Sequence, residues 1–197
     1  KTSNDVGVFG RISFLIFIVV LGIESARQTV ARLKKGRRVE ELEQFALNDS
    51  MTGMYNRNAY DYFVKNEKDF EGYVIVTFDL NNLKQCNDQY GHRAGDEYII
   101  NAAHIIEDNF ERYGKCYRIG GDEFCCIIPK GRYFKIERVM HKIDQDVEIL
   151  NHKNIIPVPV GIAYGYAVFT ADDTDPEKVR ERADKDMYRN KKTMKQL

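Results

Sequence analysis

The sequence lacks any excess of charge of one sign. Its 197 residues include 30 Lys and Arg and 30 Asp and Glu, so the formal net charge is zero. This balance removes any global electrostatic argument for a nucleic-acid partner. Low-complexity tracts are absent as well, and 43% of the residues are hydrophobic, which excludes a disordered polypeptide. The length suits one domain of ordinary size and a short additional segment.

Cysteine is scarce, and its spacing is not that of a metal site. The four cysteines form no C-x-x-C pair, and no His lies at zinc-ligand spacing from them. Cys125 and Cys126 are adjacent within an apolar run, where alternate side chains of a strand face opposite ways. We expect all four to be buried free thiols of a protein in a reducing compartment.

An apolar run long enough to span a bilayer is missing, although a shorter one is present. Residues 12–23 (ISFLIFIVVLGI) carry no charge. As a helix they span roughly 18 Å, whereas a bilayer needs about 20 residues. Six basic residues and no acid follow within residues 27–38, which is typical of the cytoplasmic side of a membrane segment. We predict a partial membrane segment at residues 1–26, anchored in the inner membrane, with a buried core helix as the alternative.

The basic cluster follows the apolar run instead of preceding it, which disfavours a secretory signal. The chain starts at Lys1 without an initiator Met, and we expect it to be part of a longer protein with a sensory region upstream. Residues 27–48 favour a helical linker. The basic stretch at residues 34–38 interrupts the heptads that a coiled coil needs, so the pairing of this linker is left open.

From about residue 49 onward, the hydrophobic pattern alternates between helices and strands. Helices are predicted at residues 57–68, 96–110, 134–150 and 176–192, and strands at residues 73–79, 115–119, 123–128 and 158–169. Asn56 is the expected N-cap of the first of these helices. Strands that alternate with helices and include an antiparallel hairpin favour an α+β fold, with a sheet flanked by helices.

Two carboxylates stand where strands are predicted to end. Asp79 closes an apolar strand, and Asp122 lies in a tight hairpin turn after Gly120 and Gly121. If the strand ends lie side by side, their oxygen atoms converge on one point, as Mg²⁺ requires. The glycines allow a phosphate to approach the backbone and permit positive φ in the turn. An ordinary type I′ hairpin with solvated acids is the alternative.

Four ordered motifs resemble the GGDEF family of diguanylate cyclases over about 145 residues. The pentapeptide GGDEF occupies residues 120–124. Residues 49–57 (DSMTGMYNR) look like the family's opening segment D-x-L-T-G-L-x-N-R, and residues 79–96 match its metal and guanine segment. Residues 183–191 (ADKDMYRNK) resemble its closing A-D-x-A-M-Y-x-A-K.

The resemblance implies a palm-like, mostly antiparallel central sheet flanked by helices, and the residues before it predict an N-terminal apolar and linker helix. It implies that residues 49–197 are a diguanylate cyclase domain, which condenses two GTP into cyclic di-GMP and two pyrophosphates. The enzyme would act as a homodimer, because the hydroxyl of one bound GTP attacks the phosphate of the other. The implied cofactors are two Mg²⁺ per GTP, with Mn²⁺ as an alternative.

The functional residues of the family transfer to this sequence position by position. Asp79, Asp122 and Glu123 are implied as catalytic residues that hold Mg²⁺ together with the carbonyl oxygen of Leu80. Glu123 would lie beside the attacking hydroxyl as metal partner or base. The residues implied in nucleotide binding are Asn87 and Asp96 for guanine, the amides of Asn82 and Leu83 and the charges of Lys84, Lys191 and Lys195 for phosphates, and Arg118 for a neighbouring subunit's nucleotide.

Structural roles remain open for three of these residues. Asp96 is a candidate helix cap after Gly95, Asn87 a plain turn residue, and Arg118 a solvated strand residue. A carboxylate at position 96 suits guanine because it accepts hydrogen bonds from N1–H and N2–H₂, donors that adenine lacks.

The sequence departs from the family pattern at several positions. Asn81 stands where many members have Asp, and Met194 replaces a Gly. Lys195 stands where the family has an Arg that reaches phosphate. Lysine keeps the positive charge but cannot bind phosphate through two parallel hydrogen bonds as Arg does. Glu111 and Gly114 occupy the positions of Arg and Asp in the R-x-x-D motif, at which many cyclases bind their product. We expect no product inhibition there, because Glu111 would repel the phosphates.

Two other functions compete with an active cyclase. A catalytically silent domain that binds GTP or cyclic di-GMP would usually lose signature residues, whereas this chain keeps them. A cyclase that makes mixed purine dinucleotides would need a weaker guanine acceptor than Asp96. We therefore predict a membrane-anchored diguanylate cyclase in bacterial second-messenger signalling, with its catalytic domain in the cytoplasm.

Overall fold

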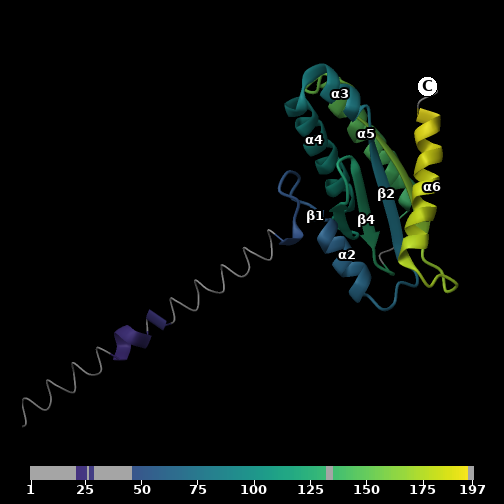
Figure 1. Ribbon diagram of the computed structural model, residues 1–197. Helices are drawn as coiled ribbons and strands as arrows, with labels where there is room; N and C mark the ends of the chain where they lie inside the picture. The colour runs from purple at the N-terminus through teal and green to yellow at the C-terminus, as the bar shows by residue number, and fades with distance from the viewer. Residues whose placement is uncertain (1–20, 26, 29–45, 132–134, 195–197) are drawn as a thin grey trace, which may run out of the picture. The chain divides into compact units, whose positions relative to one another are not determined.

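The computed structural model describes residues 21–25, 27–28, 46–131 and 135–194 (Figure 1). The chain divides into two units, residues 1–45 and 46–197. The predicted membrane segment and linker, with their apolar and linker helix, lie almost entirely outside the described residues. Within the described part of the chain, no helix is both long and apolar enough to cross a bilayer.

The second unit is built on one five-stranded sheet. Its elements are, in chain order, β1 (Tyr55–Asn56), α2 (Arg57–Asn66), β2 (Val74–Asn81), α3 (Leu83–Tyr90), α4 (His92–Phe110), β3 (Lys115–Arg118), β4 (Glu123–Ile128), α5 (Ile136–His152), β5 (Gly161–Val168) and α6 (Pro176–Met194). The strand order is β1-β3-β4-β2-β5. β1 runs parallel to β3 and the other pairs are antiparallel, so the predicted α+β fold with a mostly antiparallel sheet is confirmed.

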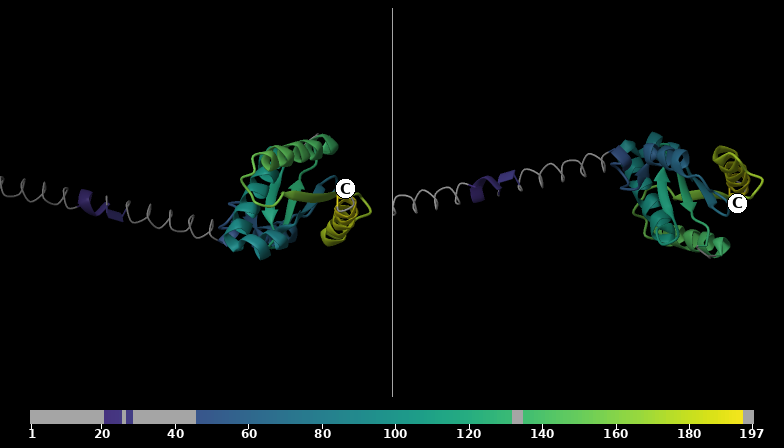
Figure 2. Two further views of the ribbon diagram at one scale, coloured as in Figure 1. Left: turned by 90° about the horizontal axis from the view of Figure 1, so that it is seen from above. Right: turned by 90° about the horizontal axis from the view of Figure 1, so that it is seen from below.

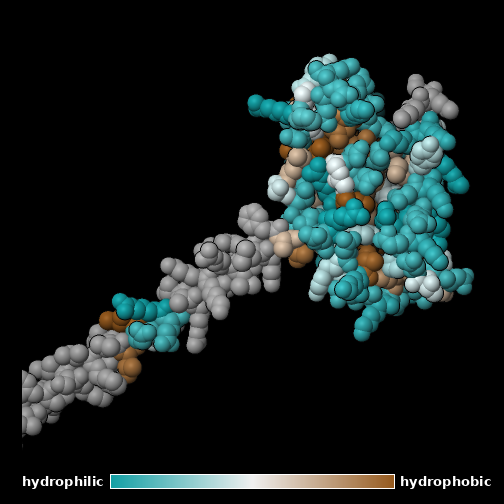
Figure 3. Space-filling view, viewed as in Figure 1, coloured by the Kyte–Doolittle hydropathy of each residue, from teal (hydrophilic) through white to brown (hydrophobic). Residues whose placement is uncertain are grey.

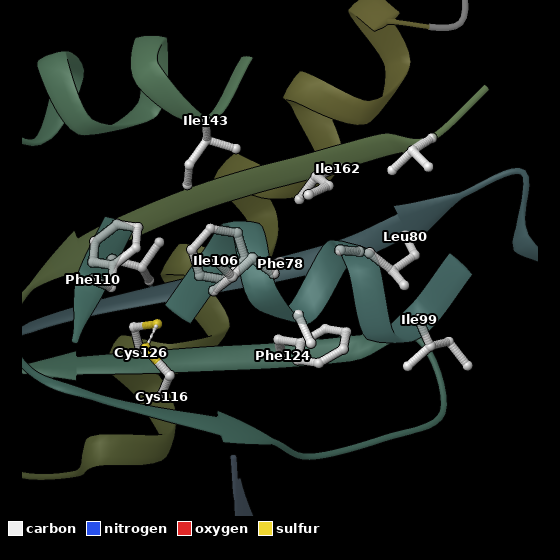
Figure 4. Packing of buried hydrophobic residues seen from close by; sticks show 14 of the residues in the cluster. Phe78, Leu80, Ile99, Ile106, Phe110, Cys116, Phe124, Cys126, Ile143 and Ile162 are labelled. Carbon is white, nitrogen blue, oxygen red and sulfur yellow. Dashed lines mark hydrogen bonds between the residues drawn. The ribbon is translucent and has the colours of Figure 1, made fainter. Parts of the chain in front are cut away.

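Helices cover both faces of the sheet, because the side chains of each strand alternate between two hydrophobic clusters. In β4, Cys126 packs in the cluster with α4 and α5, whereas Cys125 and Ile127 face α2 and α6. Figure 2 shows α5 and α6 on opposite sides of the sheet. Figure 4 shows the first cluster, in which the rings of Phe78 and Phe110 meet edge to face at 5.6 Å. Hydrophilic residues dominate the visible surface of this unit (Figure 3).

The four cysteines are buried and free, as predicted. Cys126 Sγ lies 2.9 Å from Cys116 Sγ on the neighbouring strand, and the S–H of Cys126 donates to it. Burial raises the pKa of Cys125 and Cys126. Both therefore stay protonated at neutral pH and are poor nucleophiles.

Most predicted elements are present, and β4 has the predicted bounds. Asn56 caps α2 as expected, with its side chain accepting a hydrogen bond from a backbone amide of the first turn. The sequence pattern does not predict α3, and it predicts that α4 starts at Asp96, whereas α4 begins at His92. The alternative role of Asp96 as a helix cap is therefore wrong, since the N-cap residue of α4 is Gly91, with a φ of 83°.

Candidate active site

The ends of β2 and β4 bring the predicted catalytic carboxylates together. In the antiparallel register of these central strands, Asp79 lies directly opposite Glu123. The ladder continues one step further, where the Leu80 N–H donates to the carbonyl oxygen of Asp122 at 3.0 Å. Directly opposite residues share a face of the sheet, and in β2 the residues of this parity face α6. All four predicted metal ligands thus lie at one end of the sheet.

Gly120 lies close to the Glu123 side chain in the signature loop, so a larger residue here would make the glutamate shift. A Cβ atom at Gly120 would lie 2.9 Å from Oε2 and 3.1 Å from Cβ of Glu123. The amides of Ile119 and Gly120 both donate to the carbonyl oxygen of Glu123, at 3.0 and 3.2 Å. Neither Gly120 nor Gly121 has a positive φ. The type I′ alternative is therefore wrong, since that turn needs positive φ at both central residues.

The helix α6 brings Lys191 to the same strand end. The Lys191 ammonium group donates to Oδ1 of Asp79 across 112 positions of the chain. This geometry depends on the close seating of α6 on β5, where a Cβ atom at Gly165 would lie 2.0 Å from the backbone nitrogen of Met187. The resemblance implies that Lys191 binds phosphate, and in this structure it pairs with the carboxylate of Asp79.

The donors at these strand ends suit a hard divalent cation. Asp79, Asp122 and Glu123 supply carboxylate oxygens of the kind that Mg²⁺ prefers. The Leu80 carbonyl oxygen points toward the signature loop on the same side as its N–H, and no backbone amide of that loop donates to it. Among the described residues, no three acidic, His or Cys side chains gather closely enough to hold a metal ion. The Asp79 carboxylate pairs with the ammonium group of Lys191 in this structure.

Asn82 turns the chain from β2 into α3. Its φ of 62° is left-handed, a conformation that Asn adopts more readily than most residues. Because α3 starts directly after β2, its unpaired N-terminal amides lie at the same end of the sheet as the carboxylates. Such amides attract phosphate, so the predicted donors of Asn82 and Leu83 adjoin the carboxylates. Lys84 follows with an exposed side chain, and Lys195 lies outside the described residues.

The corner between α3 and α4 holds Asn87 against the segment that carries Asp96. The Gly91 N–H donates to the carbonyl oxygen of Asn87 at 2.9 Å, and the Gly91 carbonyl accepts from Gly95 at 3.3 Å. A Cβ atom at Gly95 would lie 1.9 Å from Oδ1 of Asn87. The Asn87 amide therefore fills the space of the missing side chain, next to Asp96. Asn87 lies in a helix, so its interpretation as a turn residue is wrong.

Tyr98 joins α4 to the strand ends. Its buried hydroxyl donates to the carbonyl oxygen of Asn81 in β2 and accepts from the Gly161 amide in β5 at 2.7 Å. Burial raises the pKa of this hydroxyl, so it stays protonated as the first of these bonds requires. The bonds hold the α3–α4 corner close to the carboxylates.

Arg118 holds the signature loop from within its own subunit. Its side chain is only 11% exposed, so the alternative of a solvated strand residue is wrong. Nη1 donates to Oδ1 of Asp49 at 3.1 Å, and Nη2 donates to the carbonyl oxygen of Gly121 at 2.9 Å. Arg57 donates to the carbonyl oxygen of Ile119 at 3.2 Å. Two arginines thus hold both sides of the loop, while contact of Arg118 with a neighbouring subunit stays a prediction.

Asp49 connects this arginine to the opening segment. Its Oδ1 also accepts from the amide and the hydroxyl of Thr52, at 2.9 and 2.8 Å. Partial burial raises the pKa of Asp49, but the hydrogen bonds from Thr52 and Arg118 outweigh it and lower the pKa below its usual value. Neither Asp49 nor Arg57 is among the site residues predicted from the sequence, although the motif at residues 49–57 is a signal for both.

The structure leaves little space at one of the two positions where the family's R-x-x-D motif would lie. Glu111 is exposed at the end of α4. A Cβ atom at Gly114 would lie 2.1 Å from the carbonyl oxygen of Ile127 in β4. Since backbone cannot yield as a flexible side chain does, this position has no room for the Asp of an R-x-x-D motif. The absence of product inhibition itself stays a prediction.

Comparison with known proteins places most of the chain in a family. Residues 46–196 match the family model "Diguanylate cyclase, GGDEF domain". The chain is 30% identical over 175 residues to MucR of Pseudomonas aeruginosa, a bifunctional diguanylate cyclase/cyclic di-GMP phosphodiesterase, covering 84% of this chain and 25% of MucR. It is 29% identical over 158 residues to the diguanylate cyclase DgcS of Shewanella oneidensis, covering 77% of this chain and 52% of DgcS. The chain thus spans between a quarter and about half the length of these relatives.

The fold has a solved counterpart. The coiled coil and GGDEF domain of DgcB from Caulobacter crescentus, in complex with c-di-GMP, superposes with a TM-score of 0.72 at 23% identity. The match covers 88% of this chain and 95% of that chain. At this identity, the likeness shows the fold.

Proposed function

The chain belongs to the GGDEF domain family of diguanylate cyclases, and on this premise we propose that it condenses two molecules of GTP into cyclic di-GMP. The observation that carries the proposal is the β2–β4 register, in which Asp79 lies opposite Glu123 and the next backbone bond joins Leu80 to Asp122. The N-terminus of α3 and the α3–α4 corner adjoin these carboxylates. One region therefore offers groups suited to a cation, a triphosphate and a purine.

The reaction joins two nucleotides by two equivalent steps. In each step the ribose 3′-oxygen of one GTP attacks the α-phosphorus of the other, a P–O bond forms, and the bond to the departing pyrophosphate breaks. The exposed carboxylate of Glu123 lies beside the attacking hydroxyl, where it serves either as metal partner or as the base that takes the hydroxyl proton. The chain contributes mainly by positioning and charge neutralisation. Since each subunit offers one GTP, two subunits face each other as a homodimer.

A divalent cation would be held by the carboxylates of Asp79, Asp122 and Glu123 and by the carbonyl oxygen of Leu80. When bound, it neutralises charge on the triphosphate, and we expect two Mg²⁺ per GTP, with Mn²⁺ as a substitute.

The phosphates of GTP bind at the start of α3. In this proposal the amides of Asn82 and Leu83 donate to them, and Lys84, Lys191 and Lys195 add positive charge. Three lysines and two backbone amides together suit the several negative charges of a triphosphate.

Guanine binds at the α3–α4 corner. The Asp96 carboxylate accepts hydrogen bonds from N1–H and N2–H₂, and the adjacent Asn87 amide completes the recognition of the base edge. Adenine offers neither donor, so it would leave the carboxylate unpaired, and GTP is preferred over ATP.

Residues 49–197 form the catalytic domain in this proposal, and it works on the cytoplasmic side of the inner membrane. Residues 1–26 supply a partial membrane segment and residues 27–48 a helical linker, below an upstream sensory region. The uncharged run at residues 12–23 and the basic residues after it support this arrangement.

Product analysis tests the proposed activity. Purified protein incubated with GTP and Mg²⁺ should yield cyclic di-GMP and pyrophosphate on chromatography. Asp122→Asn should lower the rate by about 100-fold or more while GTP still binds, because one anionic ligand becomes neutral. Asp108→Asn, at an exposed position of α4, serves as the matched control. A near wild-type rate for Asp122→Asn would contradict the assignment.

The same experiment separates the cyclase from a silent signalling module. Binding of GTP or cyclic di-GMP by the wild-type protein, with no product over long incubation, would support the silent module.

A further inference from the structure

Lys191 occupies a position that the proposed chemistry does not fully use. Its ammonium group forms an ion pair with Asp79, and the two side chains are 23% and 16% exposed. Among the described residues, Asp79 is the one predicted carboxylate ligand with a cationic partner, since no ion pair involves Asp122 or Glu123. The charge of the Asp79 carboxylate is thus already neutralised before a nucleotide binds.

The packing of α6 holds the lysine in this position. In addition to the contact at Gly165, two side chains of α6 accept hydrogen bonds from backbone amides of β5. Asn190 accepts from Tyr164 and Asp186 accepts from Tyr166, both at 3.3 Å. Asn190 immediately precedes Lys191, so the strand that pairs with β2 also fixes the helix that carries the ammonium group.

A cation and an ammonium group compete for the same carboxylate. A free divalent ion must displace Lys191 from Asp79 before it gains that ligand, which opposes its binding. The triphosphate of GTP offers the lysine other anionic oxygens, and charge-assisted bonds to phosphate are strong. A nucleotide that arrives with its cation therefore removes the competitor as it delivers the ion.

We propose that Lys191 is an exchangeable counter-ion of Asp79, which suppresses the binding of free divalent cations and releases Asp79 when a nucleotide triphosphate enters. The inference rests on the proposed function, because it takes the triphosphate as the second partner of the lysine. It goes beyond phosphate binding, since it predicts that Lys191 weakens the binding of the free cation and strengthens the binding of the cation–nucleotide complex.

Binding measurements without turnover test this. Free Mn²⁺ is titrated into nucleotide-free protein and followed by its paramagnetic resonance signal. A second titration uses Mn²⁺ with the α,β-methylene analogue of GTP, which cannot react at its α-phosphate. Lys191→Met should tighten free Mn²⁺ binding about five- to tenfold and weaken the complex by a similar factor.

Lys192→Met is the matched control, because it removes the same charge from the next residue. The exposed Lys192 ammonium lies over the Tyr188 ring at 4.6 Å and has no ion pair with Asp79. It should change each affinity less than twofold, by long-range charge alone. Adding Asp79→Asn to Lys191→Met should abolish the gain in Mn²⁺ affinity, which ties that gain to the carboxylate.

Unchanged or weaker Mn²⁺ binding by folded Lys191→Met would overturn the inference, as would an equal gain in Lys192→Met. A failure of the proposed function looks different. The wild-type protein would then bind no analogue and form no product, while the Mn²⁺ titration would still report whether Lys191 shields Asp79.

Discussion

We expect Gly95→Ala to weaken GTP binding although alanine is the better helix former. Gly95 lies within α4, and replacing a helical Gly by Ala favours the helix by up to about 1 kcal/mol. The added methyl group would lie 1.9 Å from Oδ1 of Asn87, whereas real Cβ contacts essentially never fall below 3.0 Å. The Asn87 amide must therefore move by about 1 Å or turn away.

The size of the effect follows from hydrogen-bond geometry. Donor–acceptor distances fall in a window of about 0.5 Å, so this displacement breaks the proposed bond between Asn87 and guanine. Loss of such a bond from a partly buried group costs about 1–2 kcal/mol, which corresponds to roughly tenfold in affinity. The unfolding free energy should stay equal or rise, because Asn87 is half-buried and its side chain has room to move outward.

A double-mutant cycle with the α,β-methylene analogue of GTP measures this. Asn87→Ala removes the atom that the new methyl group meets, so the double variant should bind no worse than Asn87→Ala alone. His104→Ala, at an exposed position of α4, controls for helix propensity. Urea unfolding of each variant monitors stability.

Two results would refute the reasoning. Wild-type affinity in a folded Gly95→Ala protein would mean that Asn87 does not contact the base. Additive losses in the double variant would mean that the methyl group acts on the nucleotide by a route independent of Asn87.

The remaining predictions concern stability. Tyr98→Phe should lower the unfolding free energy by about 1–3 kcal/mol in urea, because it removes the buried hydrogen bonds of the hydroxyl to the Asn81 carbonyl and the Gly161 amide. Tyr90→Phe should cost nothing measurable, because Tyr90 is 53% exposed. Asp49→Asn should destabilise the protein by about 1 kcal/mol at pH 7. The folded pKa of Asp49 lies below its usual 3.8, so its contribution is complete above that pH and is lost as the pH falls through the folded value. The difference between wild type and Asp49→Asn should therefore vanish in acid, and a pH-independent difference would contradict the assignment.

The elements that the sequence predicted best are those with a strong hydrophobic pattern. Residues 123–128 form a strand with the expected bounds because every position after Glu123 is buried, on one face or the other. α3 escaped notice because only Leu83 and Cys86 of its residues are buried, which is too weak a pattern to show a helix. The start of α4 was missed because Gly95 suggested a break, whereas it is helical and leaves room for Asn87.

The identities of the candidate site residues were also available in the sequence. The resemblance of the four motifs to the GGDEF family implied Asp79, Asp122, Asn87 and Asp96 as site residues. What the spacing could not supply was the direction of long side chains. Arg118 turns inward to Asp49, because the opening segment packs beside the start of the signature loop.

The sequence by itself therefore determined which chemical groups this protein carries and which short segments hold them, since hydrophobic periodicity and motif spacing are local properties. Only the tertiary structure decided that Asp79 faces Glu123 and that Lys191 reaches Asp79 from a helix 112 positions away. Strand register and helix seating result from many weak packing contacts between distant segments. A single close approach, such as that of Met187 to Gly165, then fixes where a charged group lies.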